Sequence, residues 1–239
     1  MDDAQRAATG IALSVLAEAG FILAGGQALA EHGVIARMSE DVDLFALYRR
    51  HTPETFAASV DKMRAALEAA GYTVEVTRQY QAFASVTVEQ GDTTVVMDLG
   101  LDWWEHQPAD LDLGPVMSLK DSVASKLLTV YSRGYARDYL DAYSIISSER
   151  FTPGQLIDLC RRRDPHFDRE MFAAAMTGHR TVPTTEFTKY GLPAEELSRL
   201  DTTLTGFAKT IRQYKYAGQT IEPVDLTGPG HPGGGPELA

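Results

Sequence analysis

The stretch GGQALAEHGVIARMSEDVDLF, residues 25–45, decides the fold of this chain. It follows a short apolar run, residues 21–24, which predicts a strand that ends in a tight turn at Gly25 and Gly26. Residues 27–33 predict a helix that Gly33 stops. Residues 42–47 predict a second, largely buried strand. This order of elements is typical of the start of a small α/β unit.

Two aspartates, Asp41 and Asp43, stand at the start of that second strand. Strand residues two positions apart point to the same face, so both carboxylates project together while the apolar residues between them turn into the core. A divalent cation such as Mg²⁺ offsets the repulsion between two such carboxylates. The backbone N–H groups of Gly25 and Gly26 are suited to hold a phosphate. Each motif alone is more often structural, but together they predict a site for a metal and a triphosphate.

The rest of the first hundred residues predicts more helices and strands of the same unit. Apolar spacing predicts a helix over residues 4–18. Thr52 as N-cap and Pro53 at the first turn predict a helix from residue 52 to about residue 70. Three further strands are predicted over residues 72–78, 82–89 and 93–100.

After Pro115 the pattern becomes helical, with predicted helices over residues 119–132, 136–148, 153–163, 168–177 and 194–215. The last twelve residues are dense in glycine and proline and predict disorder. The fold class expected is therefore α+β. A mixed sheet domain with flanking helices spans residues 1–115, a helical domain spans 116–226, and a disordered tail spans 227–239.

A second group of charged residues lies in the segment SLKDSVASKLLTVYSRGYARDYLDAYSII, residues 118–146. Lys126 lies beside the apolar stripe of its helix, so it can lean into a cleft between the domains, where its point charge suits a phosphate. Arg137 and Asp138 open the next helix, and Asp141 follows one turn later. The alternatives are that Lys126 is an exposed surface charge and that Asp138 interacts only with the helix dipole.

A third carboxylate is expected on a later strand, where it would hold metal and help to deprotonate an attacking hydroxyl. Asp98 is the candidate, because an aspartate within an apolar strand needs a reason to be there. Asp102 is the alternative. The neighbouring Trp103, Trp104 and His106 suit either base stacking or a domain interface.

Composition limits the classes of function. The chain has 239 residues, one cysteine and a formal net charge of −11. No apolar stretch is long enough to span a membrane, no signal peptide is recognisable, and no intramolecular disulfide is possible, so the cytoplasm is the expected compartment. The negative charge means that contact with a nucleic acid needs a local basic patch, whereas a small cationic substrate would be attracted.

Residues 25–45 resemble the motif of the DNA-polymerase-β-type nucleotidyltransferases. More narrowly, they are similar to the AbiEii/AbiGii (MenT-like) toxin family, whose pattern is Gly-Gly-x-Ala-Leu, a basic residue, and then Ser-Glu-Asp-hydrophobic-Asp-Leu. The residues that match are Gly25, Gly26, Ala28, Leu29, Arg37, Ser39, Glu40, Asp41, Asp43 and Leu44. The lysine helix and the Arg-Asp-hydrophobic-x-Asp start of the next helix extend the resemblance over residues 21–146.

The resemblance implies a nucleotidyltransferase that uses Mg²⁺ and an NTP. It implies catalytic roles for Asp41, Asp43, Lys126 and Asp138, phosphate contacts from Gly25, Gly26, Arg37 and Ser39, and metal binding by Asp41, Asp43 and Asp98. It gives Asp141 a role in helix pairing or capping. It also implies transfer to the 3′ end of tRNA, arrest of translation and a cognate antitoxin. A small-molecule (aminoglycoside-type) nucleotidyltransferase and a non-enzymatic binding module are the rival interpretations.

Overall fold

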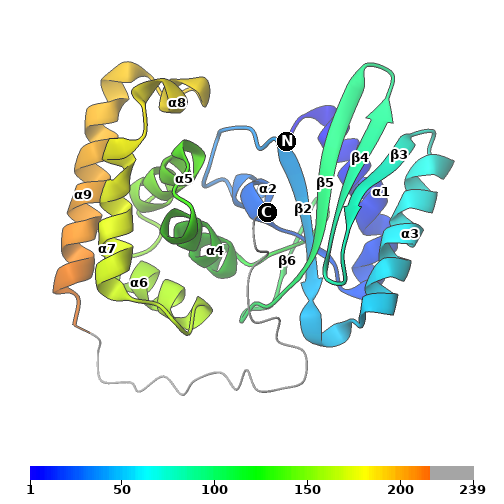
Figure 1. The fold of residues 1–239 in the computed structure, drawn as a ribbon, viewed down its shortest axis with the longest axis horizontal. Helices are drawn as coiled ribbons and strands as arrows, with labels where there is room; N and C mark the ends of the chain where they lie inside the picture. Colours follow the sequence, from blue (N-terminus) through cyan, green and yellow to red (C-terminus); the bar gives the residue numbers. More distant parts are fainter. Residues whose placement is uncertain (216–239) are drawn as a thin grey trace.

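The structure is a computed structural model, and residues 1–215 are described. Its first half contains a seven-stranded mixed sheet in the order β3-β4-β5-β2-β1-β7-β6 (Figure 1). The strands are β1 (Ile22–Leu23), β2 (Asp41–Leu47), β3 (Thr73–Gln79), β4 (Phe83–Gln90), β5 (Thr93–Asp102), β6 (Ala109–Leu111) and β7 (Gly114–Val116). Strand β2 pairs in parallel with β5 and antiparallel with β1, which places the two aspartate-bearing strands side by side.

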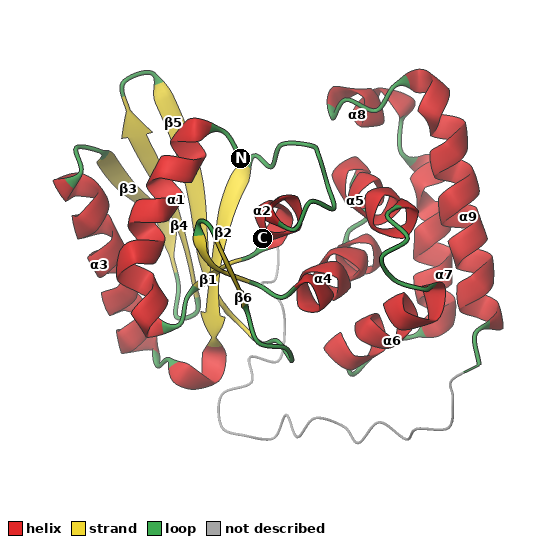
Figure 2. Cartoon of the chain, turned by 180° about the vertical axis from the view of Figure 1, so that it is seen from behind, coloured by secondary structure: helices red, strands yellow, loops and turns green. Residues whose placement is uncertain are grey.

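Helices α1 (Asp3–Leu16) and α3 (Pro53–Ala69) cover one face of the sheet (Figure 2). Burial alternates along β2, and Val42, Leu44 and Ala46 are fully buried in the core that the sheet forms with these helices. The intervening residues of β2, including Asp41 and Asp43, point to the opposite face. That face is turned toward the helical half of the molecule.

The second half of the described chain is helical. Its helices are α4 (Leu119–Ser132), α5 (Ala136–Ser147), α6 (Pro153–Arg163), α7 (Arg169–Thr177), α8 (Thr184–Lys189) and α9 (Leu197–Gln213). They share a second hydrophobic cluster, to which α9 contributes Leu200, Leu204, Phe207 and Ile211 at helical spacing. Leu29 of the short helix α2 (Gly25–Glu31) also belongs to this cluster, so α2 joins the sheet to the helical half.

The α+β fold class is confirmed. The predicted N-cap Thr52 does cap α3, and Thr152 caps α6 in the same way. Strands β6 and β7 and helix α8 were not predicted, because each is too short to show a hydrophobic period. The predicted turn at Gly25 and Gly26 is instead the first turn of α2. The predicted disordered tail, residues 227–239, lies outside the described residues.

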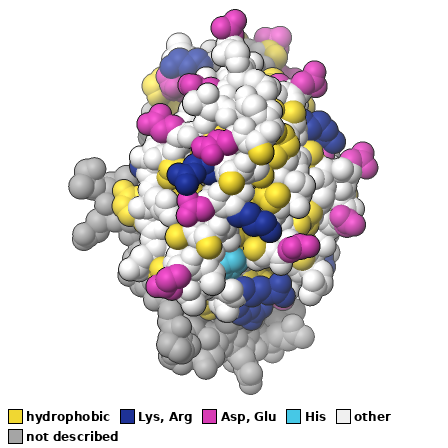
Figure 3. Space-filling view, turned by 90° about the vertical axis from the view of Figure 1, so that its right-hand side faces the viewer, with side chains coloured by type: hydrophobic (Ala, Val, Ile, Leu, Met, Phe, Trp, Pro, Cys, Tyr) yellow, Lys and Arg dark blue, Asp and Glu magenta, His cyan; other side chains and the backbone are white. Residues whose placement is uncertain are grey.

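No helix among the described residues is long and apolar enough to cross a membrane. Figure 3 shows the side of the molecule that carries α3 and β3. Acidic and basic side chains are interspersed across this side and form no continuous basic patch among its described residues.

Candidate active site between the sheet and the helices

Three carboxylates meet on the sheet face that is turned toward the helical half. In the parallel pairing of β2 with β5, Asp43 lies opposite Asp98, and Asp41 is two residues earlier on β2. Register partners of adjacent strands point to the same face, so Asp98 joins the two aspartates of β2. The Ser85 hydroxyl of β4 donates a hydrogen bond of 2.6 Å to Oδ1 of Asp98 and fixes that side chain.

The electrostatics of this group favour a bound cation. Burial, followed by the charges of Asp41 and Asp98, raises the pKa of Asp43 to about 7, although Lys126 and Arg133 act in the opposite direction. Burial also raises the pKa of Asp98, against the lowering effect of the Ser85 hydrogen bond. Carboxylates that resist ionisation in this way are stabilised by a positive charge placed between them.

The donor set fits a magnesium ion that takes part of its coordination from substrate. No group of three or more His, Cys, Asp or Glu side chains in the described part of the chain is gathered closely enough to hold a metal by itself. Mg²⁺ usually binds through one or two carboxylates together with water and substrate phosphates. The residues that would hold it are Asp41 and Asp43, with Asp98 beside them.

The two glycines of α2 leave the space that these side chains use. Gly25 has φ +60°, and a Cβ atom built there would overlap Oδ2 of Asp43. A Cβ atom on Gly26 would lie 2.8 Å from the hydroxyl of Ser39. The start of α2 therefore lies directly against Asp43 and Ser39, and a phosphate held at the glycine backbone would lie beside the carboxylates.

We expect Gly25→Ala to reduce nucleotidyl transfer by roughly two orders of magnitude, because the new methyl group displaces Asp43 and small misplacements of reacting groups are costly. The φ of +60° adds backbone strain, so unfolding should be measured alongside turnover. Gly206→Ala in α9 is the matched control, since its Cβ would meet no atom within 4 Å. Unchanged turnover in Gly25→Ala would contradict the placement of Asp43.

Two buried glutamines hold the loop that leads into β2. Gln5 of α1 donates 3.0 Å to the carbonyl of Ser39, and Gln27 of α2 donates 3.4 Å to the same oxygen. The hydroxyl of Ser39 lies 3.4 Å from Oδ1 of Asp41. Nothing in the sequence pattern singled out these glutamines, because a glutamine on an amphipathic helix is usually exposed.

Opposite the carboxylates, a buried aspartate of α5 holds two cations. Asp141 accepts hydrogen bonds of 2.6 and 2.5 Å from Nε and Nη2 of Arg37, and its Oδ2 lies 3.0 Å from Nζ of Lys126. All three side chains are almost fully buried. Asp141 thus orients Arg37 and Lys126, the two cations that were predicted to bind phosphate. The sequence had indicated only helix pairing or capping for Asp141.

Asp138 is buried among protein groups, whereas a residue that contacts substrate needs an accessible side chain. It is fully buried, accepts hydrogen bonds of 3.0 Å from Nε and Nη2 of Arg133, and caps α5 at the backbone N–H of Tyr135. Burial opposes its ionisation, but the hydrogen bonds and charge of Arg133, the charge of Lys126 and the N–H of Tyr135 together lower the pKa of Asp138. Asp138 is linked to the site through Arg133, whose charge acts on Asp43 and which sequence reasoning missed, and its own charge also acts on Lys126 and Arg37.

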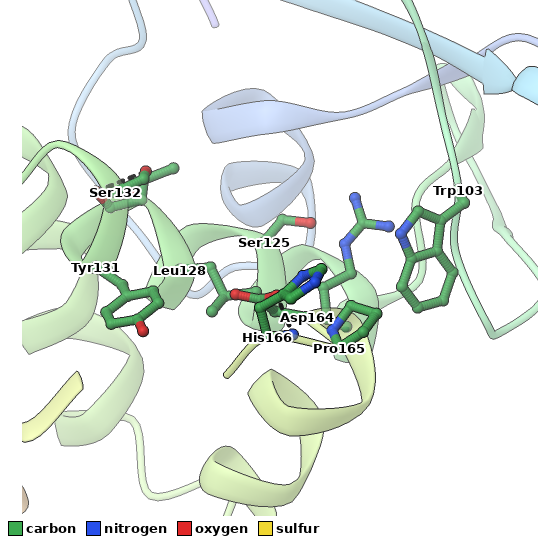
Figure 4. Close-up of a pocket in the computed structure, with 10 residues that line it drawn as sticks. Trp103, Ser125, Leu128, Tyr131, Ser132, Asp164, Pro165 and His166 are labelled. Atoms are coloured by element: carbon green, nitrogen blue, oxygen red, sulfur yellow. Dashed lines mark hydrogen bonds and ion pairs between the residues drawn. The ribbon is translucent and has the colours of Figure 1, made fainter. Parts of the chain in front are cut away.

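Asp102, the alternative third carboxylate, lies four residues farther along β5, opposite Leu47. It pairs with Arg163 of α6, whose guanidinium carbon lies 4.8 Å from the centre of the Trp103 ring. Trp103 also lines a pocket of about 380 Å³. Figure 4 shows Trp103 at one end of this pocket, with residues of α4 and of the segment after α6 along its wall. The geometry therefore favours Asp98 as the third carboxylate. Arg162 and Arg163 form ion pairs between the helical half and the sheet half of the molecule.

This choice predicts different outcomes for two matched substitutions. We expect Asp98→Asn to reduce turnover by roughly 10²- to 10⁴-fold, the usual contribution of a general base. Asp102→Asn should leave turnover within a few-fold and reduce only stability, because it weakens an ion pair between the sheet and α6. Steady-state kinetics of both variants distinguish the two aspartates, and the reverse order of effects would contradict the geometry.

Comparison with known proteins identifies the family of the chain. The family model described as "Nucleotidyl transferase AbiEii toxin, Type IV TA system" matches residues 12–216. The chain belongs to the AbiEii family. The matched span includes the three carboxylates, both cations and Asp141. No curated protein has a sequence that matches the chain significantly.

Solved structures share the fold of this AbiEii-family chain. JHP933 from Helicobacter pylori has a TM-score of 0.60 at 14% identity, with 88% of this chain and 91% of that chain covered. The nucleotidyltransferase toxin MenT4 from Mycobacterium tuberculosis has a TM-score of 0.59 at 14% identity, with 89% and 84% covered. A structure described as a nucleotidyltransferase from H. pylori has a TM-score of 0.60 at 12% identity, with 89% and 96% covered.

Proposed function

We propose that this AbiEii-family chain transfers a nucleotide from Mg²⁺-bound NTP to the 3′ end of tRNA and so blocks translation, and that a cognate antitoxin counteracts it. The observation that carries the transferase chemistry is the arrangement of three carboxylates on one sheet face opposite two cations held by Asp141. A metal and a triphosphate supply the opposite charges that each side needs. The tRNA acceptor and the antitoxin rest on the resemblance to the toxin family.

The residues of the chain divide the work of an in-line displacement. Lys126 and Arg37 bind and neutralise the triphosphate, while Gly25 and Gly26 let its oxygens approach the backbone. When bound to the aspartates, Mg²⁺ contributes Lewis-acid activation and charge neutralisation. Asp98 accepts the proton of the acceptor hydroxyl, whose oxygen forms a bond to the α-phosphorus as the bond to pyrophosphate breaks. The raised pKa of Asp98 suits its role as the proton acceptor.

The proposal is tested by incubating the full chain with Mg²⁺, each α-labelled NTP in turn, and total tRNA. We expect label to appear in tRNA with the wild type and not with Asp41→Asn. Periodate-oxidised tRNA, which lacks an intact 3′-terminal diol, is the acceptor control and should remain unlabelled. Absence of label in tRNA from a preparation that binds NTP would contradict the tRNA acceptor.

A parallel reaction with aminoglycosides separates the rival acceptor class. The net charge of −11 gives a cationic small acceptor long-range attraction that tRNA lacks. Label in the aminoglycoside and none in tRNA would replace the proposed acceptor while leaving the transferase chemistry intact. Label in neither acceptor, at any NTP, would favour a binding module.

A further inference from the structure

A pocket of about 470 Å³ lies in the helical half, between the start of α5 and the segment around α8. Its volume is within the range of small-ligand sites, roughly 300–1,000 Å³. Tyr135 and Tyr190 are its two aromatic wall residues, and Arg137 and Glu186 supply polar groups to the same wall. Tyr135 is 56% exposed, so its ring is open to a ligand from solvent.

Both tyrosines of this pocket contact arginines of the candidate active site. The guanidinium carbon of Arg37 lies 5.9 Å from the centre of the Tyr190 ring, and that of Arg133 lies 5.4 Å from the centre of the Tyr135 ring. Arg37 shares Asp141 with Lys126, and the charge of Arg133 acts on Asp43. The pocket is therefore next to Arg37, one of the two cations proposed to bind the triphosphate, and next to Arg133.

A third contact joins the pocket to the aspartate strand. Arg137 of the pocket wall lies 3.2 Å from the carboxylate of Glu40, the residue directly before Asp41. The pocket thus adjoins both the cations and the start of β2. The base of an NTP is attached to the α-phosphate through the ribose, so it must bind close to the site that holds the phosphates.

We infer that the pocket between Tyr135 and Tyr190 receives the nucleobase of the incoming NTP. Aromatic rings bind any base through its π-face. Arg137 pairs with Glu40 and Glu186 pairs with Lys189, and the guanidinium donors and carboxylate oxygens that these ion pairs leave over could bind the edge of a base. The inference rests on the proposed function, since it assumes that the triphosphate lies at Lys126 and Arg37.

Calorimetry with two ligands tests the inference without an acceptor or turnover. The ligands are the Mg²⁺ complexes of an α,β-methylene NTP, tried with each of the four bases, and of inorganic tripolyphosphate, which has no base. The wild type should bind at least one NTP analogue more tightly than tripolyphosphate. The double variant Tyr135→Ala/Tyr190→Ala should lose roughly tenfold or more in affinity for that analogue, the size of a lost base stack, and keep its affinity for tripolyphosphate.

Two control variants sharpen the result. Tyr135→Phe/Tyr190→Phe keeps both rings and should bind the analogue within a few-fold of the wild type. Tyr80→Ala removes another tyrosine, 66% exposed in the turn between β3 and β4, and should have no effect. Equal losses for both ligands in the alanine variant, or a wild type that binds tripolyphosphate as tightly as every analogue, would overturn the inference.

The remaining outcomes show whether the pocket holds the base of the NTP or a base of the acceptor. They also separate failure of this inference from failure of the proposed function. If the alanine variant binds the NTP analogue normally but has a raised KM for the acceptor, the pocket holds the acceptor's base and the inference is wrong. If the wild type binds neither ligand, the triphosphate site itself is wrong, and the proposed function fails together with the inference that rests on it.

Discussion

Replacing Asp43 by asparagine is expected to abolish nucleotidyl transfer and, at neutral pH, to stabilise the metal-free protein. Asp43 is one of the carboxylates proposed to hold the metal, so its loss should reduce turnover by roughly 10²- to 10³-fold or more. The gain in stability has a separate cause. Burial and the neighbouring aspartates raise the pKa of Asp43 from 3.8 to about 7, so its ionised form is unfavourable in the folded chain.

The sign of the effect follows from proton binding. Between pH 3.8 and about 7 the folded protein holds a proton on Asp43 that the unfolded chain has lost, so stability falls as pH rises through this window. Asparagine removes that dependence. We expect the variant to melt a few degrees higher than the wild type above pH 7, as about 1 kcal/mol corresponds to roughly 2–4 °C in a chain of this size. The difference should disappear near pH 4.

Thermal melts in EDTA from pH 4 to pH 8 provide the measurement, with Asp110→Asn on the exposed part of β6 as control. Adding Mg²⁺ and NTP should reverse the order, because ligand stabilises only the chain that binds it. A variant that melts lower than the wild type at pH 8 in EDTA would contradict the crowded carboxylate site.

Asp141→Asn is expected to have the largest effect on stability. Asp141 neutralises Arg37 and Lys126, which are both almost fully buried. Removing one member of a buried ion network leaves uncompensated charge and typically costs about 3–5 kcal/mol. The two cations also lose their orientation, so KM for NTP should rise even in molecules that remain folded.

Denaturant unfolding, with NTP binding measured below the transition, separates these two consequences. Glu40→Gln is the matched control, because Glu40 pairs with Arg137 at the surface, where an ion pair contributes about 1 kcal/mol or less. A loss below 1 kcal/mol for Asp141→Asn, together with unchanged NTP affinity, would contradict its place at the centre of the cation network.

The local parts of the site were predictable from the sequence. A period of two places Asp41 and Asp43 on one strand face, and the structure has this arrangement. The pairing of Asp98 with Asp43 depends on the register between two strands more than fifty residues apart, which only the folded sheet fixes. The apolar strand around Asp98 made it the candidate, but without the register the sequence left Asp102 open as the alternative.

The contacts between distant segments were beyond local reasoning. Asp141 and Arg37 are separated by 104 positions, and nothing in the spacing of α5 indicates that an arginine from the loop before β2 reaches it. The same holds for Arg133, whose charge acts on Asp43 although it follows α4 as an ordinary surface-type residue. The charged residues of α4 and α5 suggested a cleft, and the folded structure showed which pairs form there.

The most direct test of the central claim follows the fate of each phosphate. The full chain is incubated with Mg²⁺ and tRNA, once with α-labelled and once with γ-labelled NTP, with Asp41→Asn as the control. Attack at the α-phosphorus predicts that the α-label becomes attached to the acceptor and that the γ-label leaves in pyrophosphate, both only with the wild type. Transfer of the γ-label to the acceptor, or α-label transfer that persists in Asp41→Asn, would contradict a nucleotidyl transfer site built on Asp41, Asp43 and Asp98.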